Sequence, residues 1–305
     1  MKLRTASLIV AGLIVADAAP LLAQTSFPPL RRNEFSVLDM RVDHVTDSDI
    51  YQGNRKFVAS LNTIIEFQYV QPQWETGTEY LPVTWDVGMH ARRIEIDVPG
   101  GAPIANTLQS VAARIGALAQ ITRRTSMSFQ LDPGMYSDIH DVSAGDFSAP
   151  FGMRLMFDPH EHDLTWIFGL HINPRHQFAV IPEIGVRARI FYDWVLHLYL
   201  PNPRLTYEFH DDWTFNVGAE WIGGAYNLSK TFGDEFGRPE LNDTTLTYRD
   251  IRVMAGVKWW FAEDSYLSLN AGWSVKRSYI FDDVKGLTLN GRGAPFIQAA
   301  LHSEF

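Results

Sequence analysis

Apolar and polar residues alternate with a period of two through much of the chain. The clearest stretch is Phe57–Tyr69, where mostly apolar residues at odd positions alternate with mostly polar residues at even positions. Successive side chains of a β-strand point to opposite faces, so this pattern predicts a strand with one apolar and one polar face. Further segments of this kind are 83–92, 127–131, 151–157, 164–172, 178–188, 194–200, 205–209, 213–221, 251–261, 267–275 and 293–305.

Two segments are less regular. Residues 35–44 alternate poorly and are expected to form a weak first strand. Between Gln109 and Thr122, apolar residues recur at the spacing of an amphipathic helix, but they also alternate without a break from Val111 to Ile121. Because strands are predicted on both sides, we expect a strand here as well, followed by a turn at Arg123-Arg124.

The connections between these strands fall into two classes. The long ones are 133–149, 227–245 and 281–292, and the short ones are 123–124, 191–193, 211–212 and 262–264. In an up-and-down membrane barrel, connections alternate between the two ends, with longer loops outside and shorter turns at the periplasmic side. Counted in this way, the three long connections all fall outside and the four short ones all fall at the periplasmic side.

The predicted fold is therefore all-β, a transmembrane antiparallel up-and-down β-barrel of about 12–14 strands. The lower count applies if the segments at Trp194 and Leu205 merge and the weak first strand is absent. A soluble β-sandwich or lipocalin-like barrel is the alternative. Aromatic residues near strand ends, expected to form girdles at the membrane interfaces, are Trp74, Trp194, Trp213, Trp221, Trp259, Phe261 and Tyr266.

The amino-terminal segment has the pattern of a secretory signal peptide. Met1–Arg4 is basic, and the apolar run Ala6–Ala16 has the ~7–15 residues of a signal core, short of the ~18–20 needed to span a membrane. Cleavage is expected after Ala18 or Ala23. We therefore predict a cleaved signal peptide at residues 1–23, a short leader at 24–34, and a barrel at 35–305.

Composition excludes several classes of protein. The chain has 0 Cys, which excludes disulfides and thiolate chemistry. The 26 Lys and Arg residues are outnumbered by 35 Asp and Glu residues, which argues against nucleic acid as a partner. A hydrophobic content of 46% suits a barrel that faces lipid with half of its side chains and water with the other half.

The last predicted strand ends in an aromatic residue, Phe305, and carries Ala300 and Gln298 before it, with Ser303 at a position that is usually apolar. This strand resembles the final strand of the outer-membrane β-barrels of Gram-negative bacteria. The resemblance implies a location in the outer membrane, in contact with lipid and lipopolysaccharide. It also implies that Phe305 is part of the signal read by the barrel assembly machinery.

A second resemblance is carried by Pro182-Glu183-Ile184-Gly185, by the segment from Trp194 to Pro201, and by Leu205-Thr206-Tyr207. It is to an uncharacterised family of bacterial outer-membrane barrels known only as a domain of unknown function, and it covers roughly the carboxyl-terminal half. It implies a barrel in the outer membrane and brings no activity or catalytic residue.

The charged residues on the inward face are the candidate functional residues. They must be hydrated or paired, because unpaired burial costs several kcal/mol. Two interpretations stay open: a mixed-charge network that fills the lumen, or a pore whose arginine-rich wall guides anionic or zwitterionic solutes. The pore-lining candidates are Glu66, Arg92, Arg114, Arg154, Glu183, Arg187, Arg189, Glu220, Arg252 and Lys258, and the same face should carry Arg204, Glu208, Asp250, Lys276 and Glu304.

Motifs that suggest catalysis or metal binding have simpler explanations. In His302-Ser303-Glu304, the serine should face away from the other two residues on a strand. His160-Glu161-His162 lies in a predicted turn without a third ligand. The aspartates near the first long loop match no calcium-loop spacing. We therefore expect no enzyme, no cofactor and no metal.

The sequence predicts a passive, porin-like channel for an unknown small solute. A structural or adhesive barrel with a closed lumen is the first alternative. An outer-membrane lipid hydrolase is the second, and it would need a Ser, His and acid set converging on the outer surface of the barrel.

Overall fold

The computed structural model describes residues 36–71, 74–78, 80–98, 101–158, 163–175, 180–200, 202–284 and 286–305, with backbone only at 58–61. The predicted signal peptide, the leader at 24–34 and His160-Glu161-His162 lie outside the described residues. Within the described residues, no helix has the length and apolar character required to cross a membrane.

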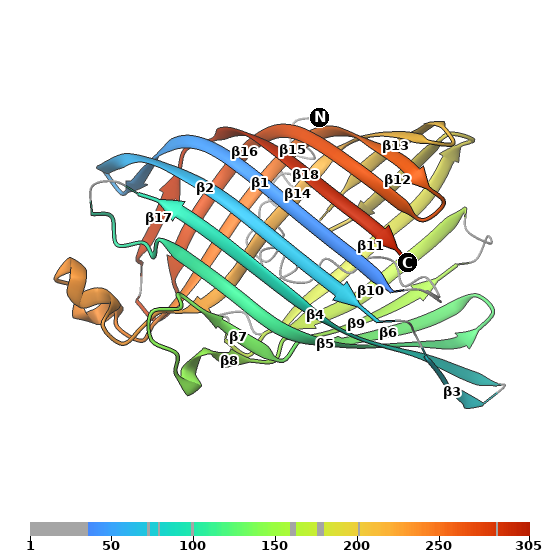
Figure 1. The fold of residues 1–305 in the computed structure, drawn as a ribbon, viewed down its shortest axis with the longest axis horizontal. Helices are drawn as coiled ribbons and strands as arrows, with labels where there is room; N and C mark the ends of the chain where they lie inside the picture. Colours follow the sequence, from blue (N-terminus) through green and yellow to red (C-terminus); the bar gives the residue numbers. More distant parts are fainter. Residues whose placement is uncertain are drawn as a thin grey trace, which may run out of the picture.

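The described part of the chain forms a single β-sheet of 18 strands that curves into a barrel (Figure 1). The strands are β1 (Val37–Gln52), β2 (Arg55–Val70), β3 (Trp74–Thr78), β4 (Leu81–Asp97), β5 (Thr107–Thr122), β6 (Thr125–Leu131), β7 (Gly134–Ser137), β8 (Phe147–Ser148), β9 (Phe151–Phe157), β10 (Leu164–Ile172), β11 (Val180–Phe191), β12 (Trp194–Tyr199), β13 (Arg204–His210), β14 (Trp213–Asn227), β15 (Thr245–Ala262), β16 (Ser265–Phe281), β17 (Thr288–Gly291) and β18 (Ala294–Glu304).

The sheet closes because β1 pairs antiparallel with both β2 and β18, in a register that places Val37 opposite Glu304. Several short strands continue longer ones along the same neighbour: β2 and β3 both pair with β4, β6 and β7 both pair with β5, and β17 and β18 both pair with β16. The result is a closed antiparallel barrel of 14 strands across the described residues. The predicted fold class is confirmed at the higher of the two counts, since β1 is full-length and β12 and β13 do not merge.

The ambiguous segment is a strand, as predicted. β5 pairs with β4 on one side and with β6 and β7 on the other. Its two faces differ, because Ser110 and Arg114 are buried while Val111 and Ile115 are exposed. The strand pattern wins over the helical one because two neighbouring strands supply its hydrogen bonds.

The connections lie at two ends of the barrel, as the sequence predicts. The four predicted short turns and the carboxyl terminus share one end, here called the carboxyl-terminal end, and the predicted long loops share the other, here called the loop end. The two-residue turn between β1 and β2, at Gly53-Asn54, also lies at the loop end. The long loops contain more structure than expected. The first holds β7 and β8, and the third holds β17. The second holds two short 3-10 helices, η3 (Phe232–Phe236) and η4 (Pro239–Leu241).

An apolar belt surrounds the outside of the barrel. Its exposed side chains come from strands all around the wall and include Met40, Ile65, Met89, Ile115, Leu155, Phe168, Ile184, Leu198, Val217, Val253, Leu269 and Ile297. Exposed aromatic residues gather toward the carboxyl-terminal end, where the rings of Trp213 and Trp259 stack at 6.2 Å. Apolar exposure on this scale is stable in lipid rather than in water. Tyr266 is a correction to the predicted girdle, because it lines the lumen.

The lumen at the loop end is filled by an apolar core. Its members are almost fully buried and include Ile50, Ile64, Ile94, Leu108, Ala112, Tyr136, Ile222, Tyr226, Leu246, Tyr248, Phe281 and Leu289. They come from β1, β2, β4, β5, β7, β14, β15, β16 and β17, so that strands from opposite sides of the barrel meet in one cluster. Dense packing of this kind leaves few voids large enough for water.

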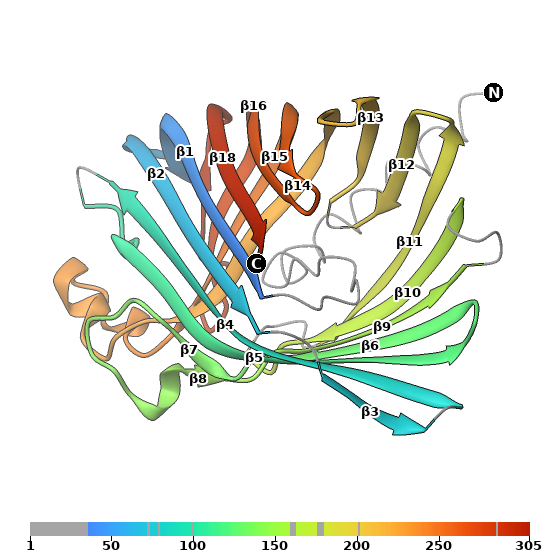
Figure 2. The same ribbon diagram turned by 45° about the vertical axis from the view of Figure 1, so that its right-hand side comes forward.

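The wall is uneven, because β12 and β13 have only 6 and 7 residues, whereas β14 and β15 beside them have 15 and 18 (Figure 2). The ladder between β13 and β14 ends where Arg204 faces Gly218, while β14 continues to Asn227. At that far end, Asn227 forms a single parallel bridge with Ser137 of β7. The loop-end part of β14 therefore meets β5 and β7 mainly through side chains. We call this contact the seam.

Candidate functional site: a polar cavity in the lumen

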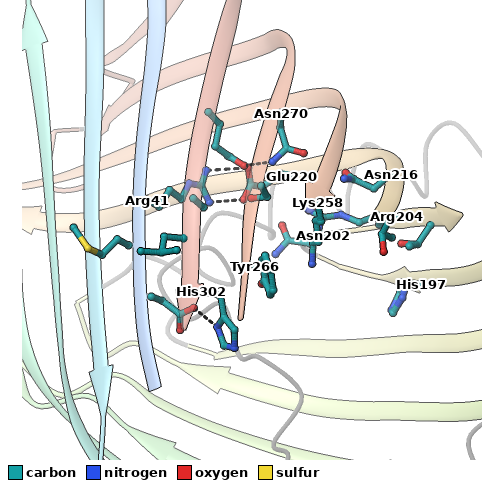
Figure 3. A pocket seen from close by; sticks show the side chains of 18 of the residues that line it. Arg41, His197, Asn202, Arg204, Asn216, Glu220, Lys258, Tyr266, Asn270 and His302 are labelled. Carbon is teal, nitrogen blue, oxygen red and sulfur yellow. Dashed lines mark hydrogen bonds and ion pairs between the residues drawn. The ribbon is translucent and has the colours of Figure 1, made fainter. Parts of the chain in front are cut away.

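A polar cavity of about 480 Å³ lies in the carboxyl-terminal half of the lumen (Figure 3). It reaches solvent at this end, where the side chain of Asp39 is 35% exposed. The lining side chains come mainly from β1, β2, β16 and β18 and from β12, β13, β14 and β15. They include Asp39, Arg41, Glu66, His197, Tyr199, Asn202, Arg204, Glu208, Asn216, Glu220, Lys258, Trp260, Tyr266, Asn270, Gln298 and His302.

The alternation of each strand explains why these side chains meet. On β15, even-numbered residues point inward, so Lys258 and Trp260 face the cavity while Trp259 and Phe261 face outward. Near the opening, the rings of Tyr266 and His302 stack at 4.9 Å, and the Lys258 ammonium lies 4.3 Å from the centre of the Tyr266 ring. An ammonium over an aromatic face is attracted by the ring quadrupole.

An ion-pair layer separates the cavity from the apolar core. Arg41 donates to Glu220 at 2.6 Å and to Asp43 at 2.8 Å. Arg252 donates to the same Asp43 at 2.6 Å and to Asp250 at 2.7 Å. The side chains of Arg252 and Asp43 are 0% exposed, so each charge depends on its partner for stabilisation.

Three further ion pairs lie on the inner wall. Arg92 donates to Glu66 at 2.8 Å, and His90 contacts the same carboxylate at 3.0 Å. The two remaining pairs are Arg114 with Asp86 at 3.3 Å and Arg154 with Glu183 at 2.7 Å.

The structure brings only some of the predicted pore-lining residues to the cavity. Those are Glu66, Glu220 and Lys258. Five others, which lie on the inward face but take part in buried ion pairs outside the cavity lining, are Arg92, Arg114, Arg154, Glu183 and Arg252. Arg189 pairs with Glu208 at 2.8 Å near the carboxyl-terminal end, and Arg187 shares its strand face. A pore-lining role remains a prediction for this set.

One inward residue was predicted wrongly. Lys276 is exposed, and its neighbour Arg277 is 0% exposed. The cause is a shift of register between β15 and β16, which pairs Ile251 with Lys276 but Arg252 with Ser274. A β-bulge of this kind reverses the faces of all residues beyond it.

Sequence reasoning missed Arg41 and Asp43 because their segment alternates poorly. Two opposite charges at i and i+2 on one strand share a face, and that spacing could have marked them. Asn216 was also missed, since an uncharged amide gives no signal in a search for charges.

The residues of His302-Ser303-Glu304 do not form a catalytic triad. His302 contacts Asp39 at 2.6 Å and Glu304 at 3.4 Å, whereas the Ser303 hydroxyl contacts that of Ser265 at 3.3 Å. No cluster of three or more metal-ligating His, Asp or Glu residues occurs among the residues that the structure describes.

The aspartates of the first long loop have structural contacts instead. Asp138 accepts a hydrogen bond from the backbone N–H of Ser229 at 2.9 Å, and Asp146 accepts one from the Asn227 amide at 3.0 Å. Both contacts hold this loop against the end of β14, next to the seam.

Phe305 follows the end of β18. Its backbone exchanges two hydrogen bonds with Ser36, at 2.9 and 3.0 Å, while its side chain is 64% exposed. The ring therefore contributes little packing to the barrel.

Comparison with solved structures gives low sequence identity over nearly the whole chain. The COG4313 outer membrane channel from Pseudomonas putida F1 is 10% identical with a TM-score of 0.48, covering 92% of this chain and 98% of that one. The deltaS2 mutant of the TodX monoaromatic hydrocarbon channel is 11% identical, with a TM-score of 0.44 and coverages of 93% and 94%. The toluene transporter TbuX from Ralstonia pickettii is 9% identical, with a TM-score of 0.39 and coverages of 89% and 90%.

A comparison with curated proteins finds no match. A family match is found for residues 102–288, which correspond to the family described as Domain of unknown function (DUF6268). This stretch includes the segments from Pro182 to Tyr207 and extends toward the amino terminus well beyond them. It spans more than half of the sequence, and the chain therefore belongs to the DUF6268 family.

Proposed function

We propose that this protein is an integral outer-membrane barrel that acts as a gated passive channel for a small solute. The observation that carries the proposal is the polar cavity of about 480 Å³ inside a closed barrel with an apolar outer belt. Long loops at one end and short turns at the other favour an orientation with the cavity toward the periplasm. In this orientation the loop end contacts lipopolysaccharide, and β18 with Phe305 is presented to the barrel assembly machinery.

The loop-end core means that the described arrangement is closed. A straight axial route would have to pass Leu108, Ile222, Tyr226 and Tyr248, all 0–3% exposed. Displacing such a core is costly, since removing one large buried side chain already costs about 2–5 kcal/mol. Solute passage therefore requires a movement of part of the wall.

The seam is the part of the wall that can move at the lowest cost. Elsewhere, neighbouring strands share continuous ladders, such as that between β14 and β15 from Trp213 to Asn227. At the seam the contacts described include single hydrogen bonds from Arg92 to the Gly223 carbonyl, from Ser229 to Asp138 and from Asn227 to Asp146, and the bridge between Asn227 and Ser137, but no continuous ladder. Each neutral hydrogen bond contributes only about 0.5–1.5 kcal/mol net. We infer that separation of β14 from β5 and β7 opens the channel.

A reversible cross-link across the seam tests this function. Ser137→Cys with Asn227→Cys places two thiols at partnered positions of β7 and β14, in a chain with 0 native Cys. We expect conductance in planar bilayers when the pair is reduced, and its loss on oxidation. The control is Ser278→Cys with Asn290→Cys, which joins partnered residues of the β16–β17 ladder and should leave conductance unchanged.

Equal conductance in the oxidised and reduced seam variant would contradict gating at this place.

The second candidate function is a structural barrel with a permanently closed lumen, which the buried core at the loop end favours. It predicts no conductance in the wild type or in either redox state of the cysteine variants. Heat-modifiable migration on a gel would show in each case that the barrel is folded.

A further inference from the structure

Three basic residues form a row across the inner wall. Arg187 of β11 lies opposite His197 of β12, and His197 lies opposite Arg204 of β13. Directly opposed side chains on neighbouring strands lie about 4.5–5.5 Å apart at Cβ. Arg204 therefore lies on a stretch of wall whose neighbouring strands carry basic rather than acidic side chains at the opposed positions.

The carboxylates of the cavity are already engaged with other side chains. Asp39 contacts His302 at 2.6 Å, and Glu66 accepts from Arg92 at 2.8 Å. Glu208 pairs with Arg189 at 2.8 Å, and Glu220 with Arg41 at 2.6 Å. These four are the acidic residues of the cavity lining within the described part of the chain.

Two cationic side chains of the lining have no carboxylate partner among the described residues. Within the described residues, neither Arg204 nor Lys258 has a carboxylate within ion-pair distance, and the close contact of Lys258 is the ring of Tyr266. Among charged groups, Arg204 acts most strongly on Lys258, by repulsion, and the more weakly acting Asp39 offsets only part of it. Figure 3 shows both side chains directed into the same part of the cavity.

Unsatisfied amides lie beside these cations. Asn216 is 3% exposed, lines the cavity, and has no hydrogen-bond partner for either side-chain atom. Asn202, which also lines the cavity, lacks a partner for its Oδ1. A buried amide without partners costs about 1–3 kcal/mol, so the position of Asn216 indicates a missing hydrogen-bond acceptor for its N–H groups.

We propose that Arg204, Lys258 and Asn216 form a binding site for a small anionic group, a carboxylate or phosphate on a water-soluble solute. The guanidinium offers a planar fork for two anion oxygens, the ammonium a further charge, and the amide a neutral donor. The stem of Lys258 and the ring of Tyr266 give the site one apolar side. This inference rests on the proposed channel and names the class of solute that the cavity holds on its way through.

Binding of inorganic phosphate to the refolded full barrel in detergent micelles tests the site. Titration calorimetry at pH 7 and constant ionic strength would compare the wild type with Arg204→Gln combined with Lys258→Gln. We expect at least tenfold weaker phosphate binding in the double variant, and the same result with acetate if the site takes carboxylates. The matched control is Arg123→Gln with Arg124→Gln, which removes two positive charges in the exposed β5–β6 turn and should bind phosphate as the wild type does.

Unchanged phosphate affinity in the double variant, or equal losses in the double variant and the control, would overturn the site. If the double variant does not fold, the single changes Lys258→Gln and Asn216→Leu give the same comparison. Conductance of the same preparations separates the two proposals. Phosphate binding without conductance would leave the anion site and remove the channel, whereas conductance without any phosphate binding would do the reverse.

Discussion

Arg92 of β4 donates a hydrogen bond from its Nη1 across the lumen to the backbone carbonyl oxygen of Gly223 on β14, at 2.9 Å. The second terminal nitrogen of the same guanidinium donates to Glu66 at 2.8 Å. One side chain therefore joins the inner wall to a stretch of β14 that has run past the end of its ladder with β13. Arg92 therefore takes part both in the seam and in a buried ion pair of the inner wall.

The change Arg92→Met should destabilise the barrel and loosen the seam. Removing one partner of a buried ion pair costs about 3–5 kcal/mol. Because Glu66 lines the cavity and keeps its contact with His90 at 3.0 Å, the loss should lie toward the lower end of this range. The neighbour Arg93 provides a matched control, since its side chain is 45% exposed and its pair with Glu95 should contribute at most about 1 kcal/mol. Urea unfolding in micelles measures both variants, and similar losses for Arg92→Met and Arg93→Met would contradict the assignment.

Asp282 makes the loop end sensitive to pH. It follows β16 outside the barrel wall, and partial burial raises the pKa of its carboxyl to about 6, although a hydrogen bond from Thr247 at 2.6 Å opposes the shift. A raised acid pKa means that the folded state binds more protons than the unfolded state between the ordinary value and about 6. The contribution of Asp282 to stability therefore falls as pH rises through this window.

Asp282→Asn should remove this pH dependence. Relative to the wild type, the variant should gain stability at pH 7 and lose that advantage at pH values below the ordinary aspartate pKa of about 4. Unfolding of both proteins at several pH values gives the difference directly. A difference that does not change with pH would show that Asp282 titrates normally.

A charge on the apolar belt should be costly only near the middle of the membrane. Leu269 is 54% exposed on the outer face of β16, so Leu269→Arg should lower the free energy of unfolding in bilayers by about 2–4 kcal/mol. Phe261→Arg, in the aromatic girdle at the carboxyl-terminal end, should cost about 0–1 kcal/mol. If the two changes cost the same, then the belt does not have the depth that its residues indicate.

Deletion of Phe305 should lower the yield of folded barrel in cells far more than its effect on stability explains. The ring is 64% exposed and adds little packing, but deletion also removes the two backbone hydrogen bonds with Ser36. Phe305→Asp keeps these bonds, so a similar loss of yield in this variant would have to come from recognition during assembly. Phe147→Asp is a suitable control, because Phe147 is 61% exposed in a loop at the opposite end. Phe236 would be a poor choice, since it packs against the apolar core. Equal yields for the deletion and the control would contradict a signal role.

Alternation along the chain was enough to predict the barrel, because each lipid-facing strand repeats the same two-residue pattern. It placed Arg114, Arg154 and Arg252 on the inward face, where they are buried in ion pairs. Period alone could not show which inward charges pair with each other, because the partners are far apart in the sequence. Asp43 and Arg252, for example, are separated by 209 positions.

The bulge in β16 and the seam could not be predicted from the two-residue alternation of apolar and polar residues. The bulge opposite Ile251 exchanges the faces of Lys276 and Arg277, and one extra residue leaves the surrounding alternation nearly intact. The seam depends on where β13 stops relative to β14. The stretch from Ile222 to Tyr226 gives no sign that its ladder partner on one side has ended.

The short strands of the wall have a consequence for the surrounding lipid. β12 and β13 have 6 and 7 residues, whereas β15 has 18. At about 3.3 Å per residue, β13 extends only about 23 Å before any tilt, less than the hydrocarbon thickness of about 30 Å in a typical bilayer. The bilayer must therefore thin beside these two strands, or its acyl chains must cover the wall beyond them, while on the opposite side it meets a wall of full height. The protein thus presents two hydrophobic thicknesses to one membrane, and the thinner side is the one next to the seam.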